Sequence, residues 1–235
     1  LSFDGLWDSW RRLLHVGMPA TATNLLLPAT FAAVTAMVAG YGPEAVAGYA
    51  VASRVESIVV IVIFAVQAAV GPVVGQNYGA GRVSRVRHAI VLSNRFVFFY
   101  SLAVAGVLFL VSRPFVGLFN DDATVIDTAS AYLRIVPLTY WAFGLMMVAV
   151  GAFNSVGRPM PAAVMTFAKF FIVYLPLAFV LSGVVGITGI FWANAISHLL
   201  FGFVSLIWMK RVLYVLHAEN RRPPRDSSDP PQAVL

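Results

Sequence analysis

The sequence predicts an all-α membrane protein with six transmembrane helices. Hydrophobic residues make up 60% of the 235 residues and charged residues only 11%, whereas soluble domains usually contain about 25% charged residues. Six apolar stretches are each long enough to cross a bilayer. Most of the basic residues lie in the terminal segments and connections on one side of these stretches, which is the distribution that the positive-inside rule describes.

The six predicted spans follow one another with short connections. A bilayer core about 30 Å thick is crossed by roughly 20 helical residues. Continuous apolarity favours helices, because the strands of a membrane barrel alternate over about ten residues. The predicted spans are residues 16–40, 45–74, 90–111, 129–153, 162–181 and 187–209. We therefore assign residues 15–211 to a six-helix transmembrane lobe.

The basic residues also predict the orientation of the chain. Eleven of the 16 Lys and Arg residues lie before the first span, after the last span, or in the connections that follow the second and fourth spans. The connections on the opposite side contain Arg113 alone. Because basic connections stay on the cytoplasmic side, we expect an integral protein of the plasma (inner) membrane with both termini in the cytoplasm.

The connection at residues 75–88 reads GQNYGAGRVSRVRH and raises the question of a bound phosphate. A phosphate-binding loop of the P-loop kind has a Lys followed by Ser or Thr, and this stretch has no such pair. Arginines on the cytoplasmic side explain its charge, and glycines allow a tight bend between two closely packed helices. The net charge of +6 has the same origin, so we expect no nucleic-acid partner.

Two segments flank the predicted spans. Residues 1–14 place aromatic and leucine side chains at helical spacing, with the charged residues elsewhere on the helix. This pattern is typical of an amphipathic interfacial helix or linker, and the alternative is an early start of the first span. Residues 212–235 are rich in proline and polar residues, and we expect a disordered cytoplasmic tail.

Four motifs, in this order, resemble those of the multidrug and toxic compound extrusion (MATE) transporters. They are GMP at 17–19, VGQNYGAGR at 74–82, FNSVGRPMP at 153–161 and VVGITGIFWANAISH at 184–198. The resemblance implies two six-helix lobes that face each other across a cleft, of which this chain is similar to the second. It also implies an antiporter that exports organic cations and drugs by alternating access. The expected partners are the lipid bilayer, small amphipathic or cationic substrates, and the missing N-terminal six-helix lobe.

The chain departs from the MATE pattern at two acidic positions. Some members have a Glu in the first helix of this lobe and an Asp in the fourth. Here the matching stretches read NLLLPATF at 24–31 and TYWAFGLMM at 139–147, and neither contains an acid. The resemblance therefore implies that the coupling ion, Na⁺ or H⁺, binds in the other lobe. We expect no cofactor and no metal, because the chain has no cysteine and few acids.

Ionisable side chains within the spans are the first candidates for the transport pathway, because each costs about 2.5–3.5 kcal/mol at a helix centre. Glu56 is the only carboxylate in any predicted span. We expect it either to bind a coupling cation or to pair with a basic residue on another helix. Lys169 could titrate, pair with Glu56, or extend its ammonium to the membrane interface.

Uncharged polar and polarisable residues complete the candidates for the pathway. Asn24, Gln67 and Asn194 lie within spans, where lipid offers no hydrogen bonds, so they face either a cavity or a neighbouring helix. Tyr140 and Met146 could form a polarisable surface that contacts a cation, or they could pack in the core. Candidate conformational hinges are the prolines and glycines Pro19, Pro28, Gly75, Gly79, Gly81, Pro137 and Pro176.

No arrangement of residues typical of a catalytic site is visible, so we predict that the chain is not an enzyme. The favoured function is secondary active efflux. A flippase for lipid-linked saccharides of related fold is the first alternative, and it predicts a basic cavity with Arg54 and Lys169 in its wall. A non-transporting structural membrane protein is the second, and it predicts no cleft.

Overall fold

The computed structural model describes residues 25–220, with side chains described up to residue 213. Pro19, Asn24, the predicted interfacial helix at 1–14 and the end of the tail lie outside the described residues. Within the described residues the chain is helical and contains no strand. The prediction of an all-α membrane protein is confirmed.

A first helix, Leu25–Ala39, precedes the labelled elements. The labelled elements are α2 (Pro43–Gly79), α3 (Val83–Gly117), α4 (Ala123–Ile135), η1 (Val136–Thr139), α5 (Tyr140–Ser155), α6 (Pro159–Phe167), η2 (Ala168–Tyr174), α7 (Leu175–Val185) and α8 (Ile187–Asn220). Five helical stretches are long and apolar enough to cross a membrane, and the first helix is the described part of a sixth predicted span.

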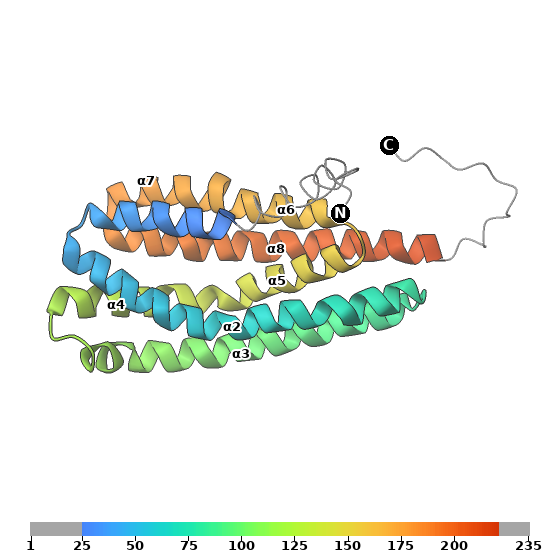
Figure 1. The fold of residues 1–235 in the computed structure, drawn as a ribbon, viewed down its shortest axis with the longest axis horizontal. Coiled ribbons are helices and arrows are strands. Elements are labelled where there is room, and N and C mark those ends of the chain that lie inside the picture. Colours follow the sequence, from blue (N-terminus) through green and yellow to red (C-terminus); the bar gives the residue numbers. More distant parts are fainter. Residues whose placement is uncertain (1–24, 221–235) are drawn as a thin grey trace, which may run out of the picture.

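The helices run side by side along the long axis of the bundle (Figure 1). The turns at 80–82 and 156–158 lie at the end of the bundle toward which α8 runs at its C-terminus. The connections at 40–42, 118–122 and Gly186 lie at the opposite end. The connections that the positive-inside rule placed on one side of the membrane, with Arg82 and Arg158, therefore share one end of the bundle.

The α8 helix extends beyond its predicted end. It continues to Asn220, so residues 212–220, which the sequence assigned to the disordered tail, are helical. The physical reason is local: the sequence RVLYVLHAEN contains no proline or glycine, and the first proline beyond it is Pro223. The prediction that the tail begins at residue 212 was wrong for this stretch.

The α5 helix is the centre of the bundle. Thirteen of its 16 residues are buried, whereas the large apolar side chains of α3, such as Phe99 and Leu110, are exposed. Helix α5 contacts α2, α3 and α8. At the contact with α8, a Cβ added to Gly202 would lie 2.7 Å from both the Cβ and the carbonyl oxygen of Ala142. Small residues thus allow two backbones to approach closely, which is how helices associate in lipid.

The three glycines of the 75–88 stretch have different roles. Gly75 and Gly79 lie within α2, and an added Cβ on Gly75 would come no closer than 3.5 Å to Ser155 of α5. Gly81 lies in the turn with φ +70, a conformation that side chains with a Cβ rarely adopt. Gly81 therefore makes the short α2–α3 turn possible, while its role as a hinge stays a prediction.

Two predicted spans are interrupted where prolines occur. Pro137 lies in the 3₁₀ segment η1, between α4 and α5. Pro176 lies at the start of α7, directly after the π-helical segment η2. A proline has no N–H and clashes with the carbonyl four residues before it, so neither helix continues as regular α-helix through its proline. Pro28, by contrast, lies within the regular first helix.

Replacing Gly202 tests the close contact between α5 and α8. We expect Gly202→Ala to lower the unfolding temperature of the detergent-solubilised protein, because overpacking a tight contact costs about 1–3 kcal/mol. The matched control is Gly106→Ala on α3, where an added Cβ meets no atom within 4 Å. Alanine has a better helix propensity than glycine, so this control variant should have an unchanged or raised unfolding temperature. The unfolding temperature of each variant can be measured by tryptophan fluorescence. Equal unfolding temperatures for the two variants would contradict the close contact between α5 and α8.

Candidate functional site

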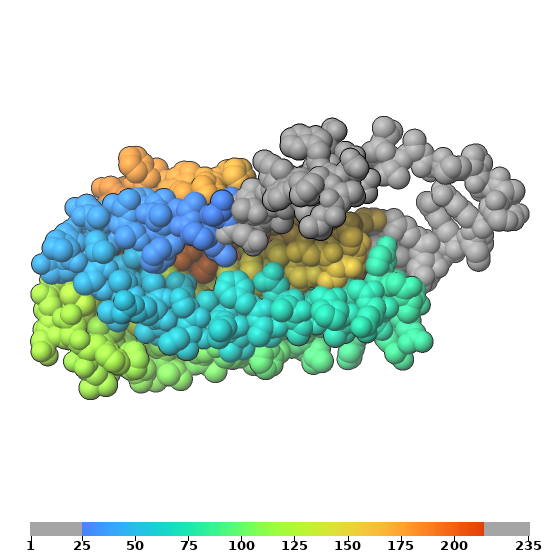
Figure 2. Space-filling model, viewed as in Figure 1, coloured from blue at the N-terminus to red at the C-terminus, as the bar shows by residue number. Residues whose placement is uncertain are grey.

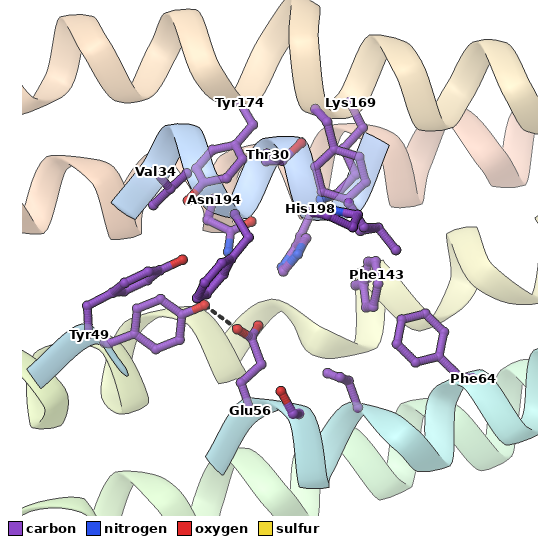
Figure 3. Close-up of a pocket in the computed structure, with 17 residues that line it drawn as sticks. Thr30, Val34, Tyr49, Glu56, Phe64, Phe143, Lys169, Tyr174, Asn194 and His198 are labelled. Atoms are coloured by element: carbon purple, nitrogen blue, oxygen red, sulfur yellow. Dashed lines mark hydrogen bonds between the residues drawn. The ribbon is translucent and has the colours of Figure 1, made fainter. Parts of the chain in front are cut away.

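A cavity of about 370 Å³ lies inside the bundle. Its wall comes from the first helix, α2, α4, α5, η2 and α8, so six elements far apart in sequence meet there. Figure 2 shows a gap between the first helix and α2 through which atoms of α8 are visible. Most of the wall is apolar or aromatic, and the polar side chains converge on the same space (Figure 3). This is the usual construction of a small-molecule site.

Glu56 provides the negative charge of the cavity from one face of α2. Tyr49, Val60 and Phe64 lie seven residues before, four after and eight after Glu56, so helical periodicity places all four on the cavity side. The Tyr132 hydroxyl donates a hydrogen bond to Oε2 of Glu56 at 2.5 Å, and the Tyr140 hydroxyl donates to Oε1 at 3.2 Å. Both tyrosine side chains are buried, and their hydroxyl groups replace the water that the carboxylate loses.

The expected ion pair of Glu56 does not form within the described part of the chain. No described Lys or Arg lies within ion-pair distance of its carboxylate. The prediction that Glu56 pairs with a basic residue on another helix was therefore wrong for these residues. Two tyrosines from α4 and α5 stabilise the carboxylate instead, through hydrogen bonds to a charged acceptor.

Lys169 provides the positive charge from η2. Its side chain is only 1% exposed, so the prediction that it extends to the membrane interface was wrong. The Nζ atom lies 3.8 Å from the ring centroid of Phe170, 5.3 Å from that of Phe143 and 6.0 Å from that of Tyr174. These rings attract a cation through their electron-rich faces. The ammonium is thus held by aromatic rings and lines the cavity.

The π-helical geometry of η2 explains why Lys169 and Tyr174 act together. In a π-helix the hydrogen bonds join residues five apart, so positions i and i+5 lie along one face. Lys169 and Tyr174 are five residues apart and both line the cavity. A regular α-helix would turn Tyr174 away from that face.

Helix α8 contributes Asn194 and His198, four residues apart on one face and both lining the cavity. The Thr139 hydroxyl donates to the carbonyl of Val136 at 2.9 Å, and its oxygen lies 3.0 Å from Nδ1 of His198. The hydroxyl proton is therefore used, so we infer that Nδ1 of His198 donates to the Thr139 oxygen. The segment η1, which contains Thr139, orients the imidazole in this way.

The structure brings together some of the predicted pathway residues and separates others. Glu56, Lys169 and Asn194 line one cavity, and the predicted hinge Pro28 lies in the same wall. Tyr140 does not line this cavity, but its hydroxyl donates a hydrogen bond to Glu56. Met146 is fully buried in the core and Gln67 packs near Gly151, both away from this cavity.

Sequence reasoning missed the aromatic residues that surround the two charges. Tyr132, Phe170 and Tyr174 were not predicted as site residues, although each contacts or faces a charged group. Phe170 and Tyr174 could have been noticed beside Lys169 in the sequence AKFFIVY. Nothing in the sequence indicates which tyrosine reaches Glu56. Among the described residues no group of acids or histidines is arranged to hold a metal ion.

An apolar helical bundle of membrane-spanning length, with a largely aromatic cavity that contains a few polar and charged side chains between its helices, is the architecture of a membrane transport protein. The chain belongs to the MatE family, whose profile matches residues 19–180. Members of this family are transporters, so the prediction that the chain is not an enzyme is confirmed.

Several proteins are similar to this chain over most of its length. The "FAD transporter" of Shewanella oneidensis is 30% identical over 209 residues, which are 89% of this chain and 46% of that protein. The "Probable multidrug resistance protein NorM" of Thermotoga maritima is 24% identical over 88% of this chain and 46% of its own length. The crystal structure of the Vibrio cholerae MATE transporter VcmN in the bent form has the same fold, with a TM-score of 0.82 and 24% identity over 92% of this chain and 50% of that one. The chain thus spans about half the length of these relatives.

The hydrogen bond from Tyr132 to Glu56 predicts a stability effect. We expect Tyr132→Phe to lower the free energy of unfolding by about 1.5–3 kcal/mol, because it removes a bond to a charged acceptor. In a Glu56→Gln background the same substitution should lower the free energy of unfolding by less. A double-mutant cycle in detergent measures the difference between these two changes in free energy.

Tyr100→Phe is the matched control for this cycle. The Tyr100 hydroxyl donates to the neutral carbonyl oxygen of Val59 at 2.7 Å, so its loss should cost only about 0.5–1.5 kcal/mol and should not depend on Glu56. If Tyr132→Phe and Tyr100→Phe behave alike in both backgrounds, the tyrosine does not stabilise the carboxylate.

Proposed function

We propose that this chain is the C-terminal six-helix lobe of a secondary active efflux transporter. The complete protein would export amphipathic organic compounds by alternating access, with the substrate held between this lobe and an N-terminal lobe of six further helices. The observation that supports this most strongly is the MatE match over residues 19–180, together with a fold shared with MATE transporters over half of their length.

Two features of the bundle support an alternating-access mechanism. The cavity is lined by six elements between residues 27 and 198, so relative movement of these elements would change its shape. Two of these helices are interrupted, by the 3₁₀ segment η1 and the π segment η2. Interrupted helices next to a membrane-embedded site are a recurring feature of secondary transporters.

Organic cations and drugs are the first proposed cargo. The names of relatives such as the "Multidrug export protein MepA" of Staphylococcus aureus, 23% identical over 87% of this chain, support this class. The acidic Glu56 and the aromatic rings of the cavity offer contacts to a cation. The second candidate is a flavin dinucleotide, which the relative named "FAD transporter" supports, and for which the buried cation Lys169 is the relevant feature.

The two alternatives from the sequence have less support. A flippase for lipid-linked saccharides predicted a basic cavity, but Arg54 is exposed and is not part of the cavity wall, and the positive charge of Lys169 faces Glu56 across the same space. A structural protein without transport predicted no cleft, and a cavity of about 370 Å³ favours transport instead.

The energy source and the orientation also belong to the proposal. Inward flow of Na⁺ or H⁺ would drive export, with the coupling ion bound in the N-terminal lobe. The chain would lie in the inner membrane with both termini in the cytoplasm, because the connections with Arg82 and Arg158 share one end of the bundle and basic connections stay in the cytoplasm.

Efflux can be measured directly with the full-length protein. Expression in a bacterium that lacks its own drug pumps should lower sensitivity to ethidium and fluoroquinolones and speed the loss of ethidium from loaded cells. Because export depends on an ion gradient, an ionophore that removes the Na⁺ and H⁺ gradients should abolish this loss. Unchanged sensitivity and unchanged efflux over a broad panel that includes flavins would contradict the proposal.

The orientation can be tested with single cysteines, since the chain contains none. Ser84 and Asp121 are both exposed and lie near opposite ends of the bundle. In intact cells a membrane-impermeant maleimide should label the Asp121→Cys variant and leave Ser84→Cys unlabelled, whereas permeabilised cells should show both. Labelling of Ser84→Cys in intact cells would reverse the proposed topology.

A further inference from the structure

We propose that Lys169 and the aromatic rings around it form a binding site for the phosphate end of a planar aromatic substrate. This inference rests on the proposed transport function and assigns the substrate chemistry to one side chain of the cavity. In this site Lys169 selects anionic aromatic compounds, and the neutral or cationic compounds that share the cavity bind without its help.

The first argument is that Lys169 is buried but has no hydrogen-bond or ion-pair partner among the described residues. Its ammonium has three donors, yet no described residue forms a hydrogen bond or ion pair with it, and the three ring centroids near Nζ lie 3.8–6.0 Å away. The side chain is 1% exposed and at the same time lines the cavity. The donors of this ammonium are therefore available to a ligand that enters the cavity.

The second argument is that Glu56, the opposite charge in the cavity, is stabilised without Lys169. Glu56 accepts hydrogen bonds from the hydroxyl groups of Tyr132 and Tyr140, and it lies on the opposite wall from Lys169 (Figure 3). The two charges therefore do not neutralise each other by direct contact. An anionic group that enters the cavity meets Lys169, whereas a cationic group at the same place is repelled.

The third argument is the shape and chemistry of the remaining wall. Phe170, Phe143 and Tyr174 face the ammonium, and Phe31 and Tyr132 add further aromatic surface to the same cavity. Flat rings stack on such side chains, and a cavity of about 370 Å³ is within the range of small-molecule sites. A planar ring system with a phosphate close to it matches both parts of the wall, because a lysine ammonium binds phosphate as a point charge.

Two flavins that differ only in a phosphate provide the test. Riboflavin and flavin mononucleotide (FMN) have the same ring, and binding of each to the purified full-length protein in detergent can be followed by quenching of flavin fluorescence. We expect FMN to bind at least about tenfold more tightly than riboflavin, the ratio that one charge-assisted contact provides. Lys169→Gln should remove this preference and leave riboflavin affinity unchanged, which also shows that the variant is folded. Lys169→Arg, which keeps the charge, should retain the preference.

Arg54→Gln is the matched control, because Arg54 is exposed outside the cavity and its loss should change neither affinity. The inference is overturned if the wild type binds both flavins equally, binds neither, or if Lys169→Gln keeps the preference for FMN. Measuring ethidium transport in proteoliposomes distinguishes failure of the Lys169 site from failure of the proposed transport function. Transport without any FMN preference overturns the Lys169 site alone, whereas an FMN preference without transport of any compound overturns the transport proposal alone.

Discussion

A lipid environment offers no hydrogen bonds to a charged side chain, and this constraint determines where the chemistry of this protein is located. A charge in the middle of a membrane helix has to face the interior of the bundle. Glu56 and Lys169 both do so, and each is surrounded by side chains that compensate for the missing water: tyrosine hydroxyls for the carboxylate and ring faces for the ammonium. The cavity is therefore the place where the two charges are tolerated, because the aromatic residues around it compensate for the missing water.

The same environment explains the arrangement of the core. Apolar side chains gain little by leaving lipid, so helices associate through close backbone contact and polar groups. Helix α5 is buried on all sides and approaches α8 at Gly202, while α3 exposes large apolar residues such as Phe99. Tyr140 and Phe143 at the start of α5 then point toward the charges of the cavity. The buried central helix thus contributes Phe143 to the wall of the site, and α4 and η2 contribute Tyr132 and Lys169.

The sequence predicted the parts of this structure that depend on composition and periodicity. The spans and the fold class follow from hydrophobic length, and the cost of polar groups in lipid indicated Glu56, Lys169 and Asn194 as separate candidates without showing that they share one cavity. The partners of the charges could not be predicted in this way. Which hydroxyl reaches Glu56 depends on how α4 and α5 pack against α2, and the joint use of Lys169 and Tyr174 depends on a π-helical segment with no distinct sequence pattern. Helix α8 exceeded its predicted length because polarity, which ends a membrane span, does not by itself end a helix.

Two opposite charges in one cavity can either pair directly or remain apart, and the difference determines what the cavity can bind. A direct ion pair would satisfy both groups, and a ligand that enters would then lose binding free energy by breaking it. Here each charge is stabilised by its own set of neutral aromatic residues, so both remain accessible while the net charge of the pair is zero. Such a cavity has a negative wall and a positive wall, and a ligand gains most when its own charges and apolar surface match that polarity. Under the proposed transport function, the positions of Glu56 and Lys169 would orient a substrate within this lobe.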